Sequence, residues 1–278
     1  MNCADHRLLC SGDFNDELFF LSFAWEGAAS KTAPKAGQFF MIKPKRSESF
    51  LGRPLSVAYL GTAENEWGNG TPAVSFLIAK RGKGTRELAG MSACSGEKAE
   101  LVGPLGNAWT DFLPAAESLG GKPIALIGGG IGLVPVMALE HENKNKGLGY
   151  RLALYAGAKT GFQLDATFSF FSFFESRQRD NEGAIASEDG TFGRKGRIPD
   201  FLEPEKYAAV CACGPEPMMK AVAEKCAAAS IPCFVSIERR MACGVGACLG
   251  CTVKTANGNR RCCADGPIFD AREIIFDE

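Results

Sequence analysis

Hydrophobic and polar residues alternate in two different ways along this chain. In the first part, short apolar runs are separated by turns rich in Gly, Pro and Asn, as in ELFFLSFAW (17–25), GQFFMIKP (37–44) and AVSFLIAK (73–80). Short strands bounded by such turns are typical of a small antiparallel barrel or sandwich. The pattern therefore predicts one β domain over residues 1–112.

The pattern changes after residue 113. Apolar runs such as PIALIGG (123–129), YRLALYAGA (150–158) and AAVCACG (208–214) now alternate with segments of helical periodicity. This alternation indicates βαβ units on a parallel sheet. We predict a nucleotide-binding α/β domain over residues 113–235 and a separate cysteine-rich domain over 236–278.

One helical segment, FQLDATFSFFSFFESRQR (162–179), is unusually rich in Phe. The simplest interpretation of this segment is a helix that buries Phe168, Phe171 and Phe174 against the sheet. A role in binding a cofactor is the less favoured alternative.

Composition removes several classes of function. The formal net charge is −1, with basic and acidic residues interspersed, so there is no electrostatic footprint for nucleic acid. No run approaches the roughly 20 apolar residues that span a bilayer, and the N-terminal segment lacks the pattern of a signal peptide. With only His6 and His141 in the chain, a histidine-based active site is disfavoured. We expect a cytoplasmic protein, in which clustered cysteines indicate metal or redox chemistry before disulfides.

A glycine-rich turn follows the first strand of the α/β domain. The run IGGGIGLVP places Gly128, Gly129, Gly130 and Gly132 between a buried strand and a helix expected to begin near Pro135. Such a turn lets the backbone approach a pyrophosphate at a helix N-terminus. It departs from the G-x-G-x-x-G fingerprint, and the next strand ends without the acidic residue expected on an NAD ribose. An ordinary Rossmann dehydrogenase is therefore disfavoured, and a glycine turn without a ligand is the alternative.

A second turn of this kind, CGPEPMM, follows an apolar strand and opens a helix. It places Cys213, Gly214 and Pro215 at the carboxyl edge of the sheet, where open α/β sheets bind their ligands.

Two stretches of the β domain suggest a phosphate site. The run GRPLS brings Arg53, Pro54 and the Ser56 hydroxyl to the start of a strand, and RGKGTREL makes a Gly82–Gly84 loop with Thr85 placed to cap the next helix. Upstream of a nucleotide-binding domain, these two stretches together predict a second nucleotide cofactor.

The C-terminal cysteines have a specific spacing. The pattern Cys243-x4-Cys248-x2-Cys251, followed by a later cysteine, is the plant-type spacing of a 2Fe–2S cluster. The glycines of this loop free backbone N–H groups to face the sulfurs, and Arg239 and Arg240 bring positive charge nearby. A zinc site remains the alternative, because Cys248 and Cys251 form a C-x2-C pair. The cysteines without such spacing are expected to be small buried hydrophobes: Cys3, Cys10, Cys94, Cys211, Cys226 and Cys233.

The later cysteine is one of an adjacent pair, Cys262 and Cys263. If this segment is an extended strand, neighbouring side chains point to opposite faces, so that only one of the two reaches the cluster loop.

Taken in order, R-P-L-S, G-x-G-T, G-G-G-I-G-x-x-P, C-G-P-x-P-M and C-x4-C-x2-C with C-x-D-G-P-I-F cover nearly the whole chain. In this series the sequence resembles the electron-transfer subunits of NAD-dependent (class 1B) dihydroorotate dehydrogenases, a branch of the ferredoxin–NADP reductase superfamily. The resemblance implies an antiparallel β-barrel flavin domain, a parallel-sheet α/β nucleotide domain and a small C-terminal 2Fe–2S domain.

The resemblance also implies a set of site residues. FAD would be held by Arg53, Pro54, Leu55, Ser56, Leu77, Ile78, Ala79, Gly84 and Thr85. NAD would be bordered by Gly128, Gly129, Gly130, Ile131, Gly132, Cys213, Gly214 and Pro215. The cluster ligands would be Cys243, Cys248, Cys251 and Cys263, the last because it occupies the C-x-D-G-P position. Leu55 stands where many superfamily members have a tyrosine that stacks on the flavin.

By resemblance, the chain passes electrons between NAD and an FMN-containing dihydroorotate dehydrogenase subunit in pyrimidine biosynthesis, in a heterotetramer with two of each subunit. The apolar pair Ile268 and Phe269 would either contact that partner or cover the cluster within this chain. One alternative is a reductase that serves another acceptor, such as an oxygenase, a sulfide or ferredoxin oxidoreductase, or a hydrogenase subunit. The other is a redox sensor or zinc-stabilised interaction module without turnover. NADH over NADPH rests on the resemblance alone, since Lys159 could meet a 2′-phosphate.

Overall fold

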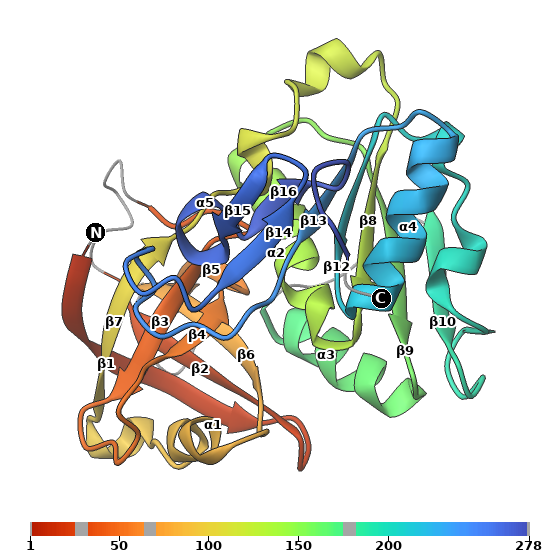
Figure 1. Ribbon diagram of the computed structural model, residues 1–278. Helices are drawn as coiled ribbons and strands as arrows, with labels where there is room; N and C mark the ends of the chain where they lie inside the picture. The colour runs from red at the N-terminus through yellow and green to blue at the C-terminus, as the bar shows by residue number, and fades with distance from the viewer. Residues whose placement is uncertain (1, 26–32, 64–70, 175–181, 277–278) are drawn as a thin grey trace.

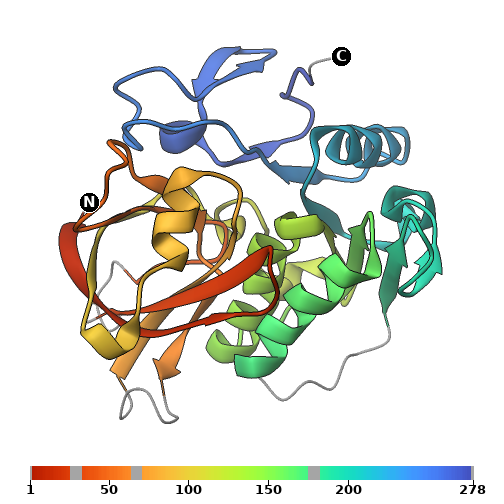
Figure 2. The same ribbon diagram turned by 90° about the horizontal axis from the view of Figure 1, so that it is seen from below.

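The computed structural model describes residues 2–25, 33–63, 71–174 and 182–276. A β domain and an α/β domain lie side by side (Figure 1), and the C-terminal segment extends across both of them (Figure 2).

The first domain is a seven-stranded sheet in the order β4-β3-β7-β1-β2-β6-β5, in which every pairing is antiparallel. Its strands are β1 (Asn2–Asp13), β2 (Leu18–Ala24), β3 (Phe39–Pro44), β4 (Arg53–Ser56), β5 (Tyr59–Ala63), β6 (Thr71–Ala79) and β7 (Lys98–Leu105). Helix α1 (Lys83–Ala89) and the 3₁₀ turn η2 (Ala93–Ser95) connect β6 to β7.

Strand β2 is buried on both faces, and this explains how the two domains are joined. Phe19, Leu21 and Phe23 pack in the core of the β domain. The alternate residues Leu18 and Phe20 face the other way and join a cluster that contains Phe170 of the α/β domain. Since successive side chains of a strand point to opposite faces, one strand contributes to two cores.

The second domain is a seven-stranded sheet in the order β11-β10-β9-β8-β12-β13-β16, parallel except for its last strand. Its strands are β8 (Ile124–Gly129), β9 (Leu152–Ala158), β10 (Gly183–Ser187), β11 (Arg194–Lys195), β12 (Ala209–Cys213), β13 (Cys233–Ser236) and β16 (Ile268–Asp270). Its helices are α2 (Leu133–Lys146), α3 (Gly161–Phe174) and α4 (Glu216–Ala228). Short 3₁₀ turns occur at η3 (Trp109–Asp111), η4 (Ala116–Leu119), η5 (Gly130–Gly132), η6 (Ile198–Phe201) and η7 (Pro204–Lys206).

Helices cover both faces of this sheet. Residues of α2 and α3 share one core with Leu126 and Cys211, whereas residues of α4 share the other with Ile127 and Val210. A parallel sheet covered on both faces reads as continuous apolar runs, as the sequence of β8 and β12 does. The predicted fold class, a β domain joined to an α/β domain and a C-terminal segment, is confirmed.

The C-terminal segment contains the hairpin β14 (Thr252–Thr255) and β15 (Gly258–Arg261), the helical turn α5 (Cys262–Asp265) and β16. Strand β16 pairs with β13, so the segment completes the sheet of the α/β domain. The predicted boundary at residue 235 therefore falls inside β13, and the domain limits stay a prediction.

The burial of apolar side chains agrees with the sequence-based predictions at some positions and differs at others. Ile268 and Phe269 are 0% and 4% exposed within this chain, because both lie in β16, which packs into the fold as the last strand of the sheet. A role as contacts for a partner is therefore wrong. Phe168 and Phe171 are buried as predicted, while the Phe174 side chain lies outside the described residues.

Cys3 and Cys94 are exposed, contrary to prediction. Helix α2 begins at Leu133, close to the predicted start near Pro135, directly after the turn η5.

Candidate functional site

A cavity of about 250 Å³ lies between the β domain and the other two parts of the chain. From the β domain it is lined by Pro54, Leu55, Ser56, Leu77, Ile78, Ala79 and Thr85. Across from them stand Ile131, Cys213 and Met241. A cavity of this size is smaller than most pockets for whole drug-sized ligands. It therefore suits the flat ring system of a flavin, with the rest of a dinucleotide outside it.

Arg53 is placed beside this cavity by the glycine of the following loop. A Cβ atom at Gly84 would lie 2.2 Å from Nε of Arg53, so only glycine leaves room for the guanidinium. The guanidinium donates to the carbonyls of Leu51 and Gly52 at 3.1 and 3.3 Å. Within the part of the chain that the structure describes, these bonds use one nitrogen, Nη1, so the N–H groups of the other two nitrogens are available to a phosphate.

Thr85 caps helix α1 in a different way from the one expected. The helix begins at Lys83, so Thr85 lies in its first turn. Its hydroxyl oxygen accepts hydrogen bonds from the backbone N–H groups of Arg81 and Gly82, both at 3.0 Å. Two N–H groups of the predicted anion-binding loop are therefore used within the chain.

A second, larger cavity of about 970 Å³ runs along the carboxyl edge of the parallel sheet. At one end it is lined by the glycine turn after β8 and by Gly214 and Pro215 after β12. At the other end it is lined by Lys159, Glu188 and Arg197. Its volume lies at the upper end of the range for small-molecule sites, as a dinucleotide requires.

Close backbone contact explains the glycines at the first end. A Cβ at Gly132 would lie 2.5 Å from the carbonyl oxygen of Cys213, and a Cβ at Gly129 would lie 2.8 Å from Cδ of Pro215. The two predicted turns therefore pack against each other, and side chains there would separate them.

The two cavities adjoin each other. Ala79, Arg81, Ile131, Glu238 and Arg239 contribute to the walls of both. A ligand in the larger cavity can therefore reach a ring held in the smaller one, which is the arrangement that hydride transfer between two cofactors requires.

The cysteine loop is a tight turn whose backbone faces the thiols. Gly244, Gly246 and Leu249 have positive φ angles of 71°, 79° and 59°. The Cys243 sulfur accepts hydrogen bonds from the N–H groups of Val245 and Cys248, both at 3.4 Å. These bonds lower the pKa of Cys243 to about 6, because they stabilise the thiolate, the form that binds metal.

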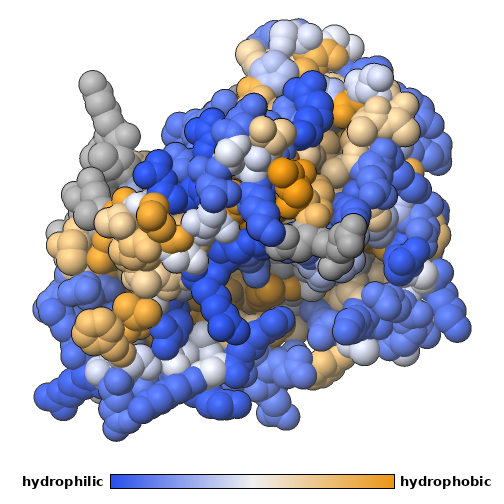
Figure 3. All heavy atoms as spheres, viewed as in Figure 1, coloured by the Kyte–Doolittle hydropathy of each residue, from blue (hydrophilic) through white to orange (hydrophobic). Residues whose placement is uncertain are grey.

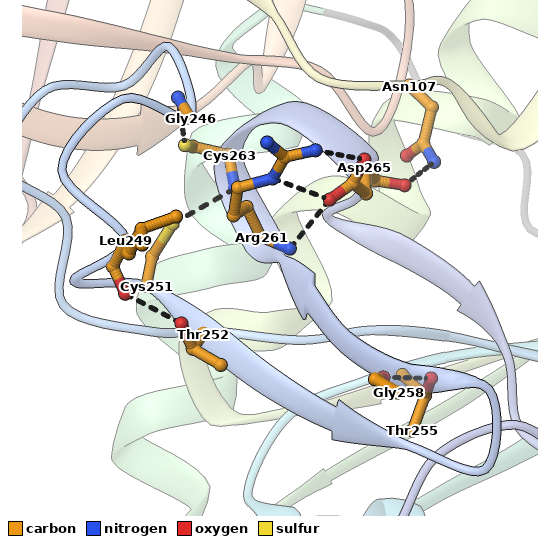
Figure 4. A network of polar contacts seen from close by, with 10 residues as sticks. All are labelled: Asn107, Gly246, Leu249, Cys251, Thr252, Thr255, Gly258, Arg261, Cys263 and Asp265. Carbon is orange, nitrogen blue, oxygen red and sulfur yellow. Dashed lines mark hydrogen bonds and ion pairs between the residues drawn. The ribbon is translucent and has the colours of Figure 1, made fainter.

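The loop reaches Cys263 as well. The N–H group of Gly246 donates to the Cys263 sulfur at 3.1 Å, and the N–H group of Cys263 donates to the Cys251 sulfur at 3.4 Å (Figure 4). Burial raises the pKa of Cys263 to about 12, a cost that a bound metal ion removes by coordinating the thiolate. The sulfurs of three predicted ligands, Cys243, Cys251 and Cys263, thus each accept a hydrogen bond from a backbone N–H group, which suits the thiolates of an anionic iron–sulfur cluster.

Cys262 points elsewhere. Its thiol donates to the carbonyl oxygen of Ile237 at 2.9 Å in a buried position. The expectation of an extended strand was wrong, because Cys262–Asp265 forms a helical turn. Adjacent side chains on a helix also point in different directions, so the reason changes while Cys263 remains the residue that faces the loop.

The side chains around the thiols add neither a preformed ligand group nor a free arginine charge from Arg239 within the described residues. Among the described residues, no group of three or more His, Cys, Asp or Glu side chains is gathered tightly enough for one metal ion. Arg239 forms an ion pair with Glu216 at 3.2 Å, so its charge is directed to α4 rather than left free for the cluster as expected.

Asn107 is a site residue that sequence reasoning missed. Its side-chain amide donates to the backbone carbonyl of Asp265 at 3.2 Å, and Asp265 lies two residues after Cys263 in the chain. Asp265 in turn accepts hydrogen bonds from the backbone and side chain of Arg261, at 2.7 and 3.0 Å. No local signal marks Asn107, because its partners lie far along the chain.

Known proteins of one family are similar to this chain along most of its length. A family model described as the iron–sulfur cluster binding domain of dihydroorotate dehydrogenase B matches residues 238–275. The chain is 37% identical over 244 residues to the dihydroorotate dehydrogenase B (NAD(+)) electron transfer subunit of Clostridium perfringens, covering 87% of each protein. The chain belongs to this family. The subunit of the same name from Caldanaerobacter subterraneus subsp. tengcongensis is 33% identical over 276 residues, covering 97% of each protein.

Solved structures agree on the fold. A structure described as an NADH-dependent reduced ferredoxin–NADP oxidoreductase has a TM-score of 0.69 at 23% identity, covering 99% of this chain and 91% of that one. A ferredoxin NADP+ reductase from Neisseria gonorrhoeae with bound FAD and NADP has a TM-score of 0.60 at 15% identity, covering 81% and 91%. Among the described residues, no helix has the length and apolar character to cross a membrane.

Proposed function

We propose that this chain is the oxidoreductase subunit that carries electrons between NAD and a catalytic partner of dihydroorotate dehydrogenase B, using FAD and a 2Fe–2S cluster. The observation that carries the proposal is the continuity of the three sites. The two cavities share wall residues, and Met241, which lines the smaller cavity, stands two residues before Cys243.

Each cofactor has a distinct role in the proposal. NADH supplies two electrons as a hydride, a flavin accepts two and releases them singly, and a 2Fe–2S cluster carries one. The residues of this chain position the groups. Leu55, Ser56 and Leu77 would hold the flavin ring, and Arg53 would bind its pyrophosphate. Gly128–Gly132 and Cys213–Pro215 would hold the nicotinamide dinucleotide against it.

The four proposed cluster ligands are Cys243, Cys248, Cys251 and Cys263. The N–H donors of Val245, Gly246 and Cys248 would stabilise the negative charge of the thiolates. We assign no acid–base chemistry on dihydroorotate to this chain.

The family's name describes an electron transfer subunit, so a catalytic partner is implied. We further propose that this partner holds FMN, that two copies of each subunit assemble, and that the complex works in the cytoplasm in the synthesis of pyrimidines. The clustered thiols, which require a reducing compartment, support the location.

The test is a comparison of the purified chain alone and with its catalytic partner. When the chain is alone, NADH should bleach its flavin, and the chain should reduce artificial dyes with NADH. It should leave dihydroorotate unchanged. Mixed with the partner, it should give electron transfer from dihydroorotate to NAD+. Oxidation of dihydroorotate by the single chain would refute the division of labour, and a flavin that NADH does not bleach would favour a sensor or structural module.

The flavin itself can be identified directly. Acid release followed by chromatography should yield FAD, because Arg53 and the Gly84 loop lie beside the ring cavity rather than in it, where a pyrophosphate reaches. Recovery of FMN alone would contradict the proposal.

A further inference from the structure

Two neighbouring strands end at the far end of the larger cavity. Strands β9 and β10 are parallel, with Ala158 opposite Ser187. The next residues, Lys159 and Glu188, therefore leave the sheet side by side, and the N–H group of Glu188 donates to the carbonyl of Ala158 at 3.0 Å. Both residues line the cavity.

In dinucleotide-binding sheets, an acidic residue near the end of the strand after the glycine turn binds the adenosine ribose. In this chain that strand, β9, ends with Lys159 and has no acidic residue there. The neighbouring strand β10 brings Glu188 to the same edge. The edge of the sheet that has no acidic residue at the end of β9 therefore has Glu188 at the end of β10.

The Glu188 carboxylate is available to a ligand. It is exposed to the cavity and forms no hydrogen bond or ion pair with the part of the chain that the structure describes. The other acids nearby are engaged. Asp189 accepts from the N–H and hydroxyl groups of Thr191 at 3.0 and 2.8 Å, and Asp200 pairs with Arg197 at 3.7 Å.

We propose that Glu188 makes this site selective for NAD(H) over NADP(H), an inference that rests on the proposed function of the cavity. Its carboxylate would accept a hydrogen bond from the 2′-hydroxyl of the adenosine ribose. A 2′-phosphate offers no such donor at neutral pH and carries nearly two negative charges. The same carboxylate therefore favours one nucleotide and repels the other.

Lys159 works in the opposite direction. Its ammonium group is exposed beside Glu188 and would attract a 2′-phosphate. Glu188 prevails because it both gains a charge-assisted hydrogen bond with the hydroxyl and opposes the phosphate. Removing the charge of Glu188 would then leave Lys159 to favour the phosphorylated nucleotide.

The experiment uses ligands that cannot reduce the flavin. ADP-ribose and 2′-phospho-ADP-ribose are titrated by calorimetry into the purified chain with its cofactors. The wild-type chain should bind ADP-ribose more tightly, and Glu188→Gln should reduce this preference roughly tenfold or more, as loss of a charged hydrogen bond does. Adding Lys159→Gln to that variant should remove the affinity gained for the 2′-phosphate.

Glu205→Gln is the matched control, because Glu205 is an exposed acid of the same domain outside both cavities. It should leave the ratio of the two dissociation constants at the wild-type value, and an unchanged flavin spectrum shows that each variant is folded. If Glu188→Gln also leaves the ratio unchanged, or if the wild-type chain binds both ligands equally, the inference is wrong while the nucleotide site stands. If the wild-type chain binds neither ligand, the inference and the proposed nucleotide site are both refuted.

Discussion

The side-chain amide of Asn107 forms two hydrogen bonds with the backbone of Ile268, a residue 161 positions later in the chain. Its nitrogen donates to the Ile268 carbonyl at 2.9 Å, and its oxygen accepts from the Ile268 N–H group at 2.9 Å. The backbone N–H group of Asn107 also donates to the carbonyl of Gly266 at 2.8 Å. One residue of the β domain thus anchors the segment that follows Cys263.

We predict that Asn107→Ala destabilises this anchor. The buried carbonyl and N–H groups of Ile268 would lose their partners, at a cost of about 1–3 kcal/mol. Chemical denaturation should show the loss in stability, and a chelator should remove iron faster than from the wild-type protein. Asn259→Ala is the control, since the exposed Asn259 lies in the nearby hairpin. Equal behaviour of the two variants would show that the anchor contributes little.

A second prediction compares two glycines of one loop. In Gly84→Ala the new methyl group would occupy the position of the Arg53 guanidinium, whereas a Cβ at Gly82 meets nothing within 4 Å. The flexible arginine would move aside, so the fold should persist while flavin affinity falls by about 1–2 kcal/mol, as loss of a charge-assisted hydrogen bond predicts. Titration of the apoprotein with FAD measures the effect. If Gly82→Ala weakened binding as much, Arg53 would not be the cause.

The adjacent cysteines give a third prediction. Cys263→Ser should lose or distort the iron–sulfur absorption and electron paramagnetic resonance signals, because its sulfur faces the cluster loop. Cys262→Ser should keep them, because its thiol donates to Ile237 instead. Each variant serves as the control for the other. The reverse result would mean that Cys262 is the fourth ligand.

The fourth prediction concerns the surface for the catalytic partner. Most of the face seen in Figure 3 is hydrophilic, with hydrophobic residues in small separate groups. On the cysteine loop, however, Val245 and Leu249 are 43% and 62% exposed. An electron carrier must bring its cluster close to the next cofactor, so these two side chains are placed to be buried by the partner.

Val245→Ser should therefore weaken the complex by about 1–2 kcal/mol, as truncation of an apolar interface residue does, without changing the spectrum of the chain. Analytical ultracentrifugation of the mixed subunits measures this. Phe162→Ser is the control, because Phe162 is 59% exposed at the start of α3 in the α/β domain. Unimpaired assembly of Val245→Ser would place the partner elsewhere.

The sequence by itself determined the parts of this protein whose chemistry is local. The spacing of Cys243, Cys248 and Cys251 and the glycine turn at Gly128–Gly132 are continuous stretches, and backbone geometry forces such residue types at such intervals. The apolar periodicity determined the strands and helices for the same reason. The fold class and the metal-binding character of the cysteine loop were therefore readable from the residues before any coordinates, whereas the family and the identities of FAD and NAD came from the resemblance of the whole motif series.

Only the tertiary structure decided what depends on contacts between distant segments. It turned Ile268 and Phe269 into core residues by adding β16 to the sheet of the α/β domain. It directed Cys262 to Ile237 and brought Asn107 to Ile268. It also set Glu188 beside Lys159 through the pairing of β9 with β10. These relations are determined by which strands pair and which faces pack, and such pairing depends on the free energy of the whole fold rather than on any short stretch of residues.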